Sequence, residues 1–129
     1  MYAHWLVLVD YELTMILPNF ATVTVQELAQ RLQQDTSQLQ LVDVREPEEL
    51  ELARIPGFLN LPLSQFPQWY GTICQTLNPD KETLVLCHHG IRSAQVCAVL
   101  VNLGFRQVKN IAGGIDAYAR EIDPTVGLY

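Results

Sequence analysis

Residues 83–100 read TLVLCHHGIRSAQVCAVL. The first four residues are apolar or β-branched, which predicts a buried parallel strand. From Ser93 onward, apolar residues recur at helical spacing as far as Gly104, a residue suited to end a helix. Gly90 stands in the short connection, where a tight turn requires positive φ. The stretch therefore predicts a strand, a tight loop and a helix.

Cys87 stands where the apolar run ends, and polar side chains follow it at once. The backbone N–H groups of a tight loop and the N-terminus of a helix both place positive charge near such a sulfur. His88, His89 and Arg92 add further donors and positive charge. This setting favours the thiolate, which is the nucleophilic form of cysteine. A buried core cysteine is the alternative, but the position of Cys87 predicts a reactive nucleophile.

Composition narrows the function classes. The 129 residues are enough for one domain with a real core. The net charge of −6 argues against nucleic acid as a partner, and an anionic substrate would need local positive charge. Three cysteines without framework spacing predict a cytoplasmic protein without disulfides. No Cys or His spacing typical of zinc sites occurs, so we expect no metal.

Residues 1–20 are predicted to be an N-terminal extension of uncertain structure, and residues 21–129 to be the domain. Residues 5–9 are apolar, but Asp10 and Glu12 interrupt the run well before it could span a membrane. A basic region and a small-residue cleavage site are both missing, so a secretory signal is not predicted. An extra strand, a loose segment and a true start near Met15 all remain open.

Strands and helices alternate along the domain. Short strands are predicted at 21–23, 39–44, 58–61 and 108–111, and helices from Thr24, over 48–53, from Ser64 and over 115–120. This alternation predicts an α/β domain with a mostly parallel sheet. Sites in such sheets form at the carboxyl ends of the strands. Cys87 and Asp43 both stand at such ends.

Several other residues have simple structural interpretations. Asp43 ends a buried strand and needs a cation, for which Arg45 is the nearest candidate. The acidic segment 46–51 is interpreted as a solvated helix face. Cys97 falls on the apolar face of the helix after the loop and is interpreted as a core residue. Cys74 has no feature that predicts a function.

Four separate features resemble the single-domain rhodaneses, sulfurtransferases of the rhodanese/Cdc25-like fold. They are VDVREPEE at 42–49, the segment from IPG at 55–57 to NLP at 60–62, the loop CHHGIRS at 87–93, and Gly113-Gly114 followed by Tyr118. The features cover residues 21–120 in the family's order. Arg54 replaces a frequent His and Tyr118 a frequent Trp, and both positions are expected to be structural. The resemblance implies a three-layer α/β/α domain.

The resemblance also implies a thiosulfate sulfurtransferase activity through a persulfide on Cys87. The backbone amides of residues 88–92 would hold the outer sulfur, with Arg92 orienting an anionic donor or stabilising the loop. Asp43 and Arg45 would brace the loop, and Ser93 would support it. The implied partners are a small sulfur anion or persulfide donor and a thiophilic acceptor or acceptor protein. No cofactor is implied, and a monomer is expected.

Alternative functions remain open. The related phosphatases and arsenate reductases usually have five residues between the cysteine and the arginine, whereas four separate Cys87 from Arg92. The shorter loop favours a single sulfur atom over phosphate. A non-turnover sulfur carrier, a redox sensor and a protein-binding module could use the same thiol. His88 and His89 either tune the thiolate and bind substrate or face solvent.

Overall fold

The computed structural model describes residues 19–129. The predicted extension, including the apolar run at 5–9 and Met15, therefore lies outside the described residues except for Asn19 and Phe20. Phe20 packs against one of the two hydrophobic cores, just ahead of the first strand.

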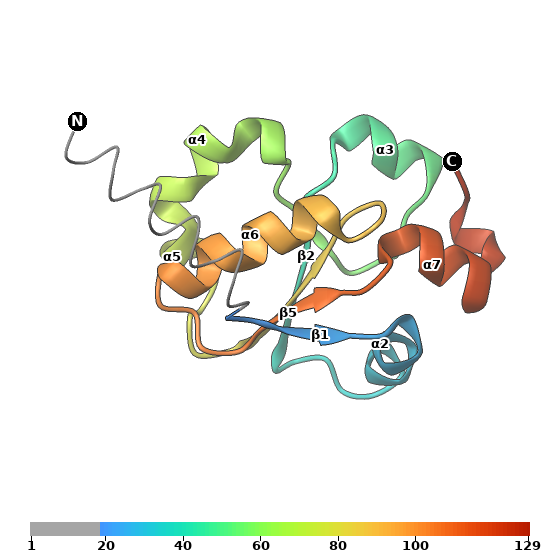
Figure 1. The fold of residues 1–129 in the computed structure, drawn as a ribbon, viewed down its shortest axis with the longest axis horizontal. Coiled ribbons are helices and arrows are strands. Elements are labelled where there is room, and N and C mark those ends of the chain that lie inside the picture. Colours follow the sequence, from blue (N-terminus) through green and yellow to red (C-terminus); the bar gives the residue numbers. More distant parts are fainter. Residues whose placement is uncertain (1–18) are drawn as a thin grey trace.

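Five strands form one sheet in which every pair of neighbours is parallel (Figure 1). The sheet confirms the predicted α/β class. Leu86 pairs with Asp43, so these two strands end at the same edge of the sheet. The order is β1-β5-β4-β2-β3, with β1 at Ala21–Val23, β2 at Leu39–Asp43, β3 at Leu59–Asn60, β4 at Glu82–Leu86 and β5 at Val108–Ile111.

Helices cover both faces of the sheet, which gives the three layers that the family resemblance implies (Figure 1). One core lies between the sheet and α4, α5 and α6, and the other between the sheet and α2 and α7. Within residues 19–129 no helix combines the length and the apolarity that a bilayer span requires. The helices are α2 (Val25–Leu32), α3 (Pro47–Leu52), α4 (Phe66–Trp69), α5 (Ile73–Thr76), α6 (Ile91–Asn102) and α7 (Gly114–Glu121).

Local signals explain where two of these helices begin and end. Thr24, where a helix is predicted to begin, caps α2 in a capping box: its hydroxyl accepts from the Glu27 N–H at 3.1 Å, and the Glu27 carboxylate accepts from the Thr24 N–H. Helix α6 begins at Ile91, two residues before the predicted Ser93, and Gly104 follows its end at φ +98°.

The single helix predicted from Ser64 is wrong. Residues 63–76 instead form a 3-10 turn, α4, a second 3-10 turn and α5. Pro67 accounts for the first break, because it lacks an N–H and its ring excludes a continuous helix through Leu63. Ser64 lies inside the first 3-10 turn. Its N–H and its hydroxyl both donate to the Glu46 carboxylate, so its side chain does not cap a helix. Trp69 is buried, while Tyr70 is exposed.

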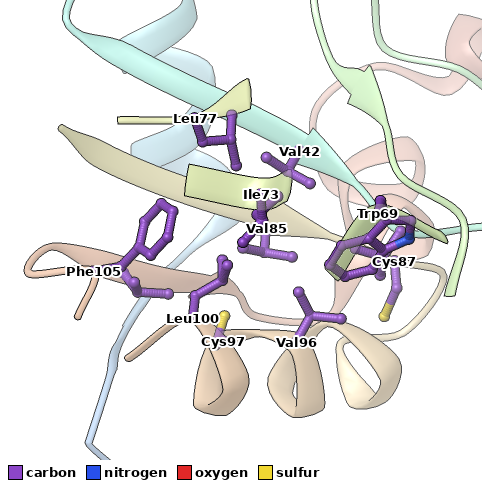
Figure 2. Close-up of a cluster of buried hydrophobic side chains, with 12 residues drawn as sticks. Val42, Trp69, Ile73, Leu77, Val85, Cys87, Val96, Cys97, Leu100 and Phe105 are labelled. Carbon is purple, nitrogen blue, oxygen red and sulfur yellow. The ribbon is translucent and has the colours of Figure 1, made fainter. Parts of the chain in front are cut away.

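The hydrophobic core beside α6 includes Cys87, the first residue of the loop between β4 and α6. Figure 2 shows Cys97 pointing from α6 into this cluster, whose members also include Cys87 and Trp69. The Trp69 indole N–H donates to the Pro62 carbonyl at 2.8 Å, so its one polar atom is satisfied. Cys97 is fully buried, which confirms its interpretation as a core residue.

The first turn of α7 holds the Cys87 loop by its backbone. The Ile115 N–H donates to the Cys87 carbonyl at 2.9 Å, and the Asp116 N–H donates to the His88 carbonyl at 3.0 Å. Gly114 makes this approach possible, because a Cβ there would lie 2.3 Å from the His88 carbonyl oxygen. Gly114 also has φ +63°, a conformation that other residues rarely adopt.

We expect Gly114→Ala to lower the free energy of unfolding by more than about 2 kcal/mol, because left-handed strain adds to a clash with backbone. The control is Gly57→Ala. Gly57 also has positive φ, but no atom lies within 4 Å of the position that a Cβ would occupy, so about 1 kcal/mol should be lost there. Urea unfolding followed by tryptophan fluorescence measures both. Equal losses would show that the loop does not need the close approach.

Candidate active site

The sulfur of Cys87 lies at the end of β4, enclosed by the loop that follows it. The residue is only 1% exposed. The Gly90 N–H donates to Cys87 Sγ at 3.0 Å, and Gly90 adopts the predicted positive φ, at +98°. Helix α6 begins at the next residue, so the sulfur also lies near the positive end of a helix dipole. The predicted backbone donor and helix N-terminus therefore both lie beside the sulfur.

A hydroxyl and an amide complete the surroundings of the sulfur. Ser93 Oγ lies 3.2 Å from Cys87 Sγ and donates to Asn110 Oδ1 at 2.5 Å. The Asn110 amide donates in turn to the Gly90 carbonyl at 3.0 Å, which fixes its orientation. Ser93 has one proton, so it can donate either to Asn110 or to a thiolate at Cys87. The sequence predicts Ser93 as a member of the site but not Asn110.

Arg92 is paired with a carboxylate. Its two terminal nitrogens donate to Glu49 at 2.8 and 2.9 Å, a bidentate ion pair that joins the loop to α3. The guanidinium holds the pKa of Glu49 at about 2, against the opposing effect of burial. Of the two roles predicted for Arg92, this geometry favours stabilisation of the loop. Substrate contact remains a prediction.

Asp43 and Arg45 form the predicted pair. Arg45 is fully buried, and its Nη2 donates to Asp43 Oδ2 at 2.7 Å. Arg45 Nη1 donates to the Glu49 carbonyl and to the Tyr129 hydroxyl, and that hydroxyl donates to Glu49 Oε1 at 2.8 Å. The pair therefore supports α3, and through Glu49 it supports Arg92, in keeping with a bracing role.

The two loop histidines differ in environment. His88 is half-buried and its ring stacks on Tyr129, with centroids 3.9 Å apart and planes 6° apart. Burial and the adjacent His89 lower the pKa of His88, which favours the neutral imidazole. The His89 side chain is 57% exposed, with Nε2 4.0 Å from Asp116. Substrate binding by either histidine remains a prediction.

His88, His89 and Asp116 are also the group of described residues that comes nearest to a metal site. Each offers one ligand atom, and these atoms lie within 4.8 Å of one another. The two imidazole rings have centroids 3.9 Å apart and planes 31° apart. Asp116 also accepts from Arg120 at 2.9 Å. An ion bound there would compete with Arg120 for the Asp116 carboxylate.

The other cysteines have different surroundings. Burial raises the pKa of Cys97, which makes its thiol unreactive. Cys74 is exposed on α5.

Three residues of the site are not predicted from the sequence: Glu49, Asn110 and Tyr129. The segment interpreted as a solvated face contains Glu49, whose carboxylate is bound by Arg92, Tyr129 and the Glu46 N–H. Asn110 gives only a weak signal, because it follows another polar residue, Lys109, in the four-residue strand β5. Tyr129 gives none, because its contacts with residues 45, 49 and 88 are all distant in sequence.

Comparison with known proteins finds a matching family and similar folds. The family model of the rhodanese-like domain matches residues 24–121. A protein named sulfurtransferase from Allochromatium vinosum is 39% identical over 78% of this chain and 90% of its own length. The solved structure of a rhodanese-related protein from Thermoplasma volcanium superposes with a TM-score of 0.66 at 29% identity, covering 80% of this chain and 94% of that one.

A longer relative is also similar. The chloroplastic rhodanese-like/PpiC domain-containing protein 12 of Arabidopsis thaliana is 46% identical over 83% of this chain. The matched region spans 36% of that protein.

The pairing of Glu49 with Arg92 predicts a pH-dependent contribution to stability. The pKa of Glu49 is about 2 in the folded protein against an ordinary 4.5, so the contribution is complete above pH 4.5 and is lost as the pH falls through 2. At pH 6 the free energy of unfolding of the wild type should exceed that of Glu49→Gln by about 1 kcal/mol. This value is reduced because the ion pair is partly exposed. Urea unfolding between pH 6 and 2 measures the difference. A difference independent of pH would contradict the ion pair.

We expect Ser93→Ala to slow alkylation of Cys87 by iodoacetamide about tenfold at pH 7, because the thiolate loses a hydroxyl donor. Mass spectrometry of the Cys87 peptide follows the reaction without interference from Cys74. The matched control is Ser64→Ala, which removes a hydroxyl outside the loop and should leave the rate unchanged. An unchanged rate in Ser93→Ala would show that the hydroxyl does not stabilise the reacting sulfur.

Proposed function

This chain belongs to the rhodanese-like domain family, and from this membership we propose that it is a sulfurtransferase that carries a sulfane sulfur on Cys87. The donor is a sulfane compound such as thiosulfate or a persulfide. The acceptor is cyanide, a thiol or an acceptor protein.

One observation carries the proposal: the Gly90 N–H donates to Cys87 Sγ at 3.0 Å within a loop that has four residues between Cys87 and Arg92. The carbonyls of Cys87 and His88 are bound by α7. With these two carbonyls directed to α7, the loop can offer N–H groups toward the sulfur side. Such donors stabilise negative charge on a sulfur just as they stabilise an oxyanion.

The reaction takes place in two steps, in a ping-pong order. The Cys87 thiolate attacks the outer sulfur of thiosulfate, the S–S bond to the sulfonate breaks, and sulfite leaves with its electron pair. Cys87 then holds a persulfide anion, which the Gly90 N–H is placed to stabilise. In the second step cyanide attacks the outer sulfur, thiocyanate leaves, and the Cys87 thiolate returns. Ser93 can turn its hydroxyl toward the thiolate at both ends of the cycle.

The sulfur-carrier alternative uses the same persulfide without small-molecule turnover. Cys87 is only 1% exposed, so under either hypothesis the loop must move before a bulky donor or acceptor reaches the sulfur. The two hypotheses differ only in the fate of the persulfide, so one experiment can compare them.

The experiment is thiocyanate formation from thiosulfate and cyanide, with p-nitrophenyl phosphate as a phosphatase control. We expect turnover by the wild type, none by Cys87→Ser, and no phosphate release. Intact mass should show one added sulfur on the wild type after exposure to donor. A persulfide without turnover would identify a dedicated carrier. Activity that survives in Cys87→Ser, or phosphate release, would overturn the proposal.

A further inference from the structure

The charge of Arg92 is already neutralised before any substrate arrives. Its guanidinium is bound at two points by Glu49, at 2.8 and 2.9 Å. The carboxylate is itself held in place by the Glu46 N–H at 2.8 Å and by the Tyr129 hydroxyl at 2.8 Å. Bidentate Arg–carboxylate pairs are among the stronger hydrogen-bonded contacts in proteins. Arg92 is therefore a poor anchor for a second anion while Glu49 is ionised.

The loop offers little other positive charge. His88 tends to the neutral form, because burial and His89 lower its pKa. His89 lies near the carboxylate of Asp116, and Asp116 also pairs with Arg120. The net charge of the chain is −6, so long-range steering also opposes an anion. An anionic donor would therefore depend on backbone N–H groups alone.

Uncharged surface borders the same loop. Ile91, four residues after the nucleophile, is 73% exposed at the start of α6. The half-exposed Tyr129 ring stacks on His88. Figure 1 shows this loop between β4 and α6 pointing toward the space between α3 and α7, beside the C-terminal end. The residues around the sulfur thus suit an apolar or uncharged carrier group better than a sulfonate.

We propose that the physiological donor is an organic persulfide whose carrier group is uncharged, and that Glu49 sets this preference over small anions by holding Arg92. The proposal rests on the proposed function, since it names the substrate class of the same site. Glu49 acts here as a specificity-determining residue that touches no substrate.

The transfer balances without any further reactant. The Cys87 thiolate attacks the outer sulfur of R–S–S–H and forms a new S–S bond. The S–S bond of the donor breaks, and R–S⁻ leaves with its electron pair. The proton on the transferred sulfur passes through water to R–S⁻, which leaves the persulfide anion on Cys87. Cys87 becomes the persulfide that the second half-reaction consumes. With thiosulfate the leaving group is the sulfite dianion, which the neutralised Arg92 cannot stabilise.

The test uses two donors that differ in one remote group: 2-hydroxyethyl persulfide, with an uncharged carrier, and 2-sulfonatoethyl persulfide, with an anionic one. Thiosulfate is the third donor. For each we measure kcat/KM with cyanide as acceptor. The wild type should prefer the hydroxyethyl donor about tenfold or more over the sulfonated one. A fourth donor, a neutral peptide that bears one cysteine persulfide, distinguishes a protein source of sulfur from a small thiol. A higher kcat/KM for the peptide than for the hydroxyethyl donor indicates a protein source, and a lower one indicates a small thiol.

The variant Glu49→Gln keeps the shape of the side chain and frees the charge of Arg92. We expect its ratio of sulfonated to hydroxyethyl kcat/KM to rise about tenfold, because one fixed countercharge is removed. The matched control is Glu48→Gln, which changes the net charge equally from an exposed neighbouring position on α3. Its ratio should stay close to that of the wild type. The ratio is unaffected by loss of folded protein, since both donors meet the same active fraction.

Equal use of the two matched donors by the wild type would overturn the proposal, and so would equal ratios in Glu49→Gln and Glu48→Gln. Failure of the proposed function looks different, because no donor would then place a sulfur on Cys87 in the intact mass. If every donor placed sulfur on Cys87 at the same rate, the proposed function would stand. Only the preference for an uncharged carrier group would be contradicted.

Discussion

The site depends on one backbone contact, the binding of two loop carbonyls by the first turn of α7. The Cys87 and His88 carbonyls accept from the N–H groups of Ile115 and Asp116. A peptide group whose carbonyl is fixed has its N–H fixed as well. These two carbonyls therefore cannot turn toward the Cys87 sulfur, where they would repel a thiolate. Gly114 allows this approach, since any side chain there would collide with the same carbonyls.

Sequence patterns are sufficient for the fold because its signals are local. Apolar runs, a capping box at Thr24 and glycines at turns predict the order of elements, and parallel pairing at one sheet edge brings Asp43 beside Leu86. The broken helix after Ser64 is not predicted, because the fit of Trp69 and Ile73 into the core tolerates broken turns as well as a continuous helix. Burial of an apolar stripe does not by itself specify regular hydrogen bonding.

The site is only partly predictable, for a physical reason. Cys87, Gly90 and Ser93 lie within seven residues, so their chemistry can be predicted from the loop itself. Glu49 and Tyr129 join the site through contacts across 43 and 80 residues. An ionisable residue in an acidic segment resembles a solvated one until its partner is known. Long-range polar contacts of this kind have no local pattern.

The buried pair of Asp43 and Arg45 shows why the charges of this site are so completely matched. Removing two charges from water is unfavourable, and their mutual attraction offsets this only when the remaining donors are also satisfied. Arg45 meets that condition through the Glu49 carbonyl and the Tyr129 hydroxyl. The same hydroxyl then orients the Glu49 carboxylate toward Arg92. The need to satisfy the buried Arg45 donors thus also positions Glu49, and through Glu49 it fixes the charge of Arg92 in the Cys87 loop.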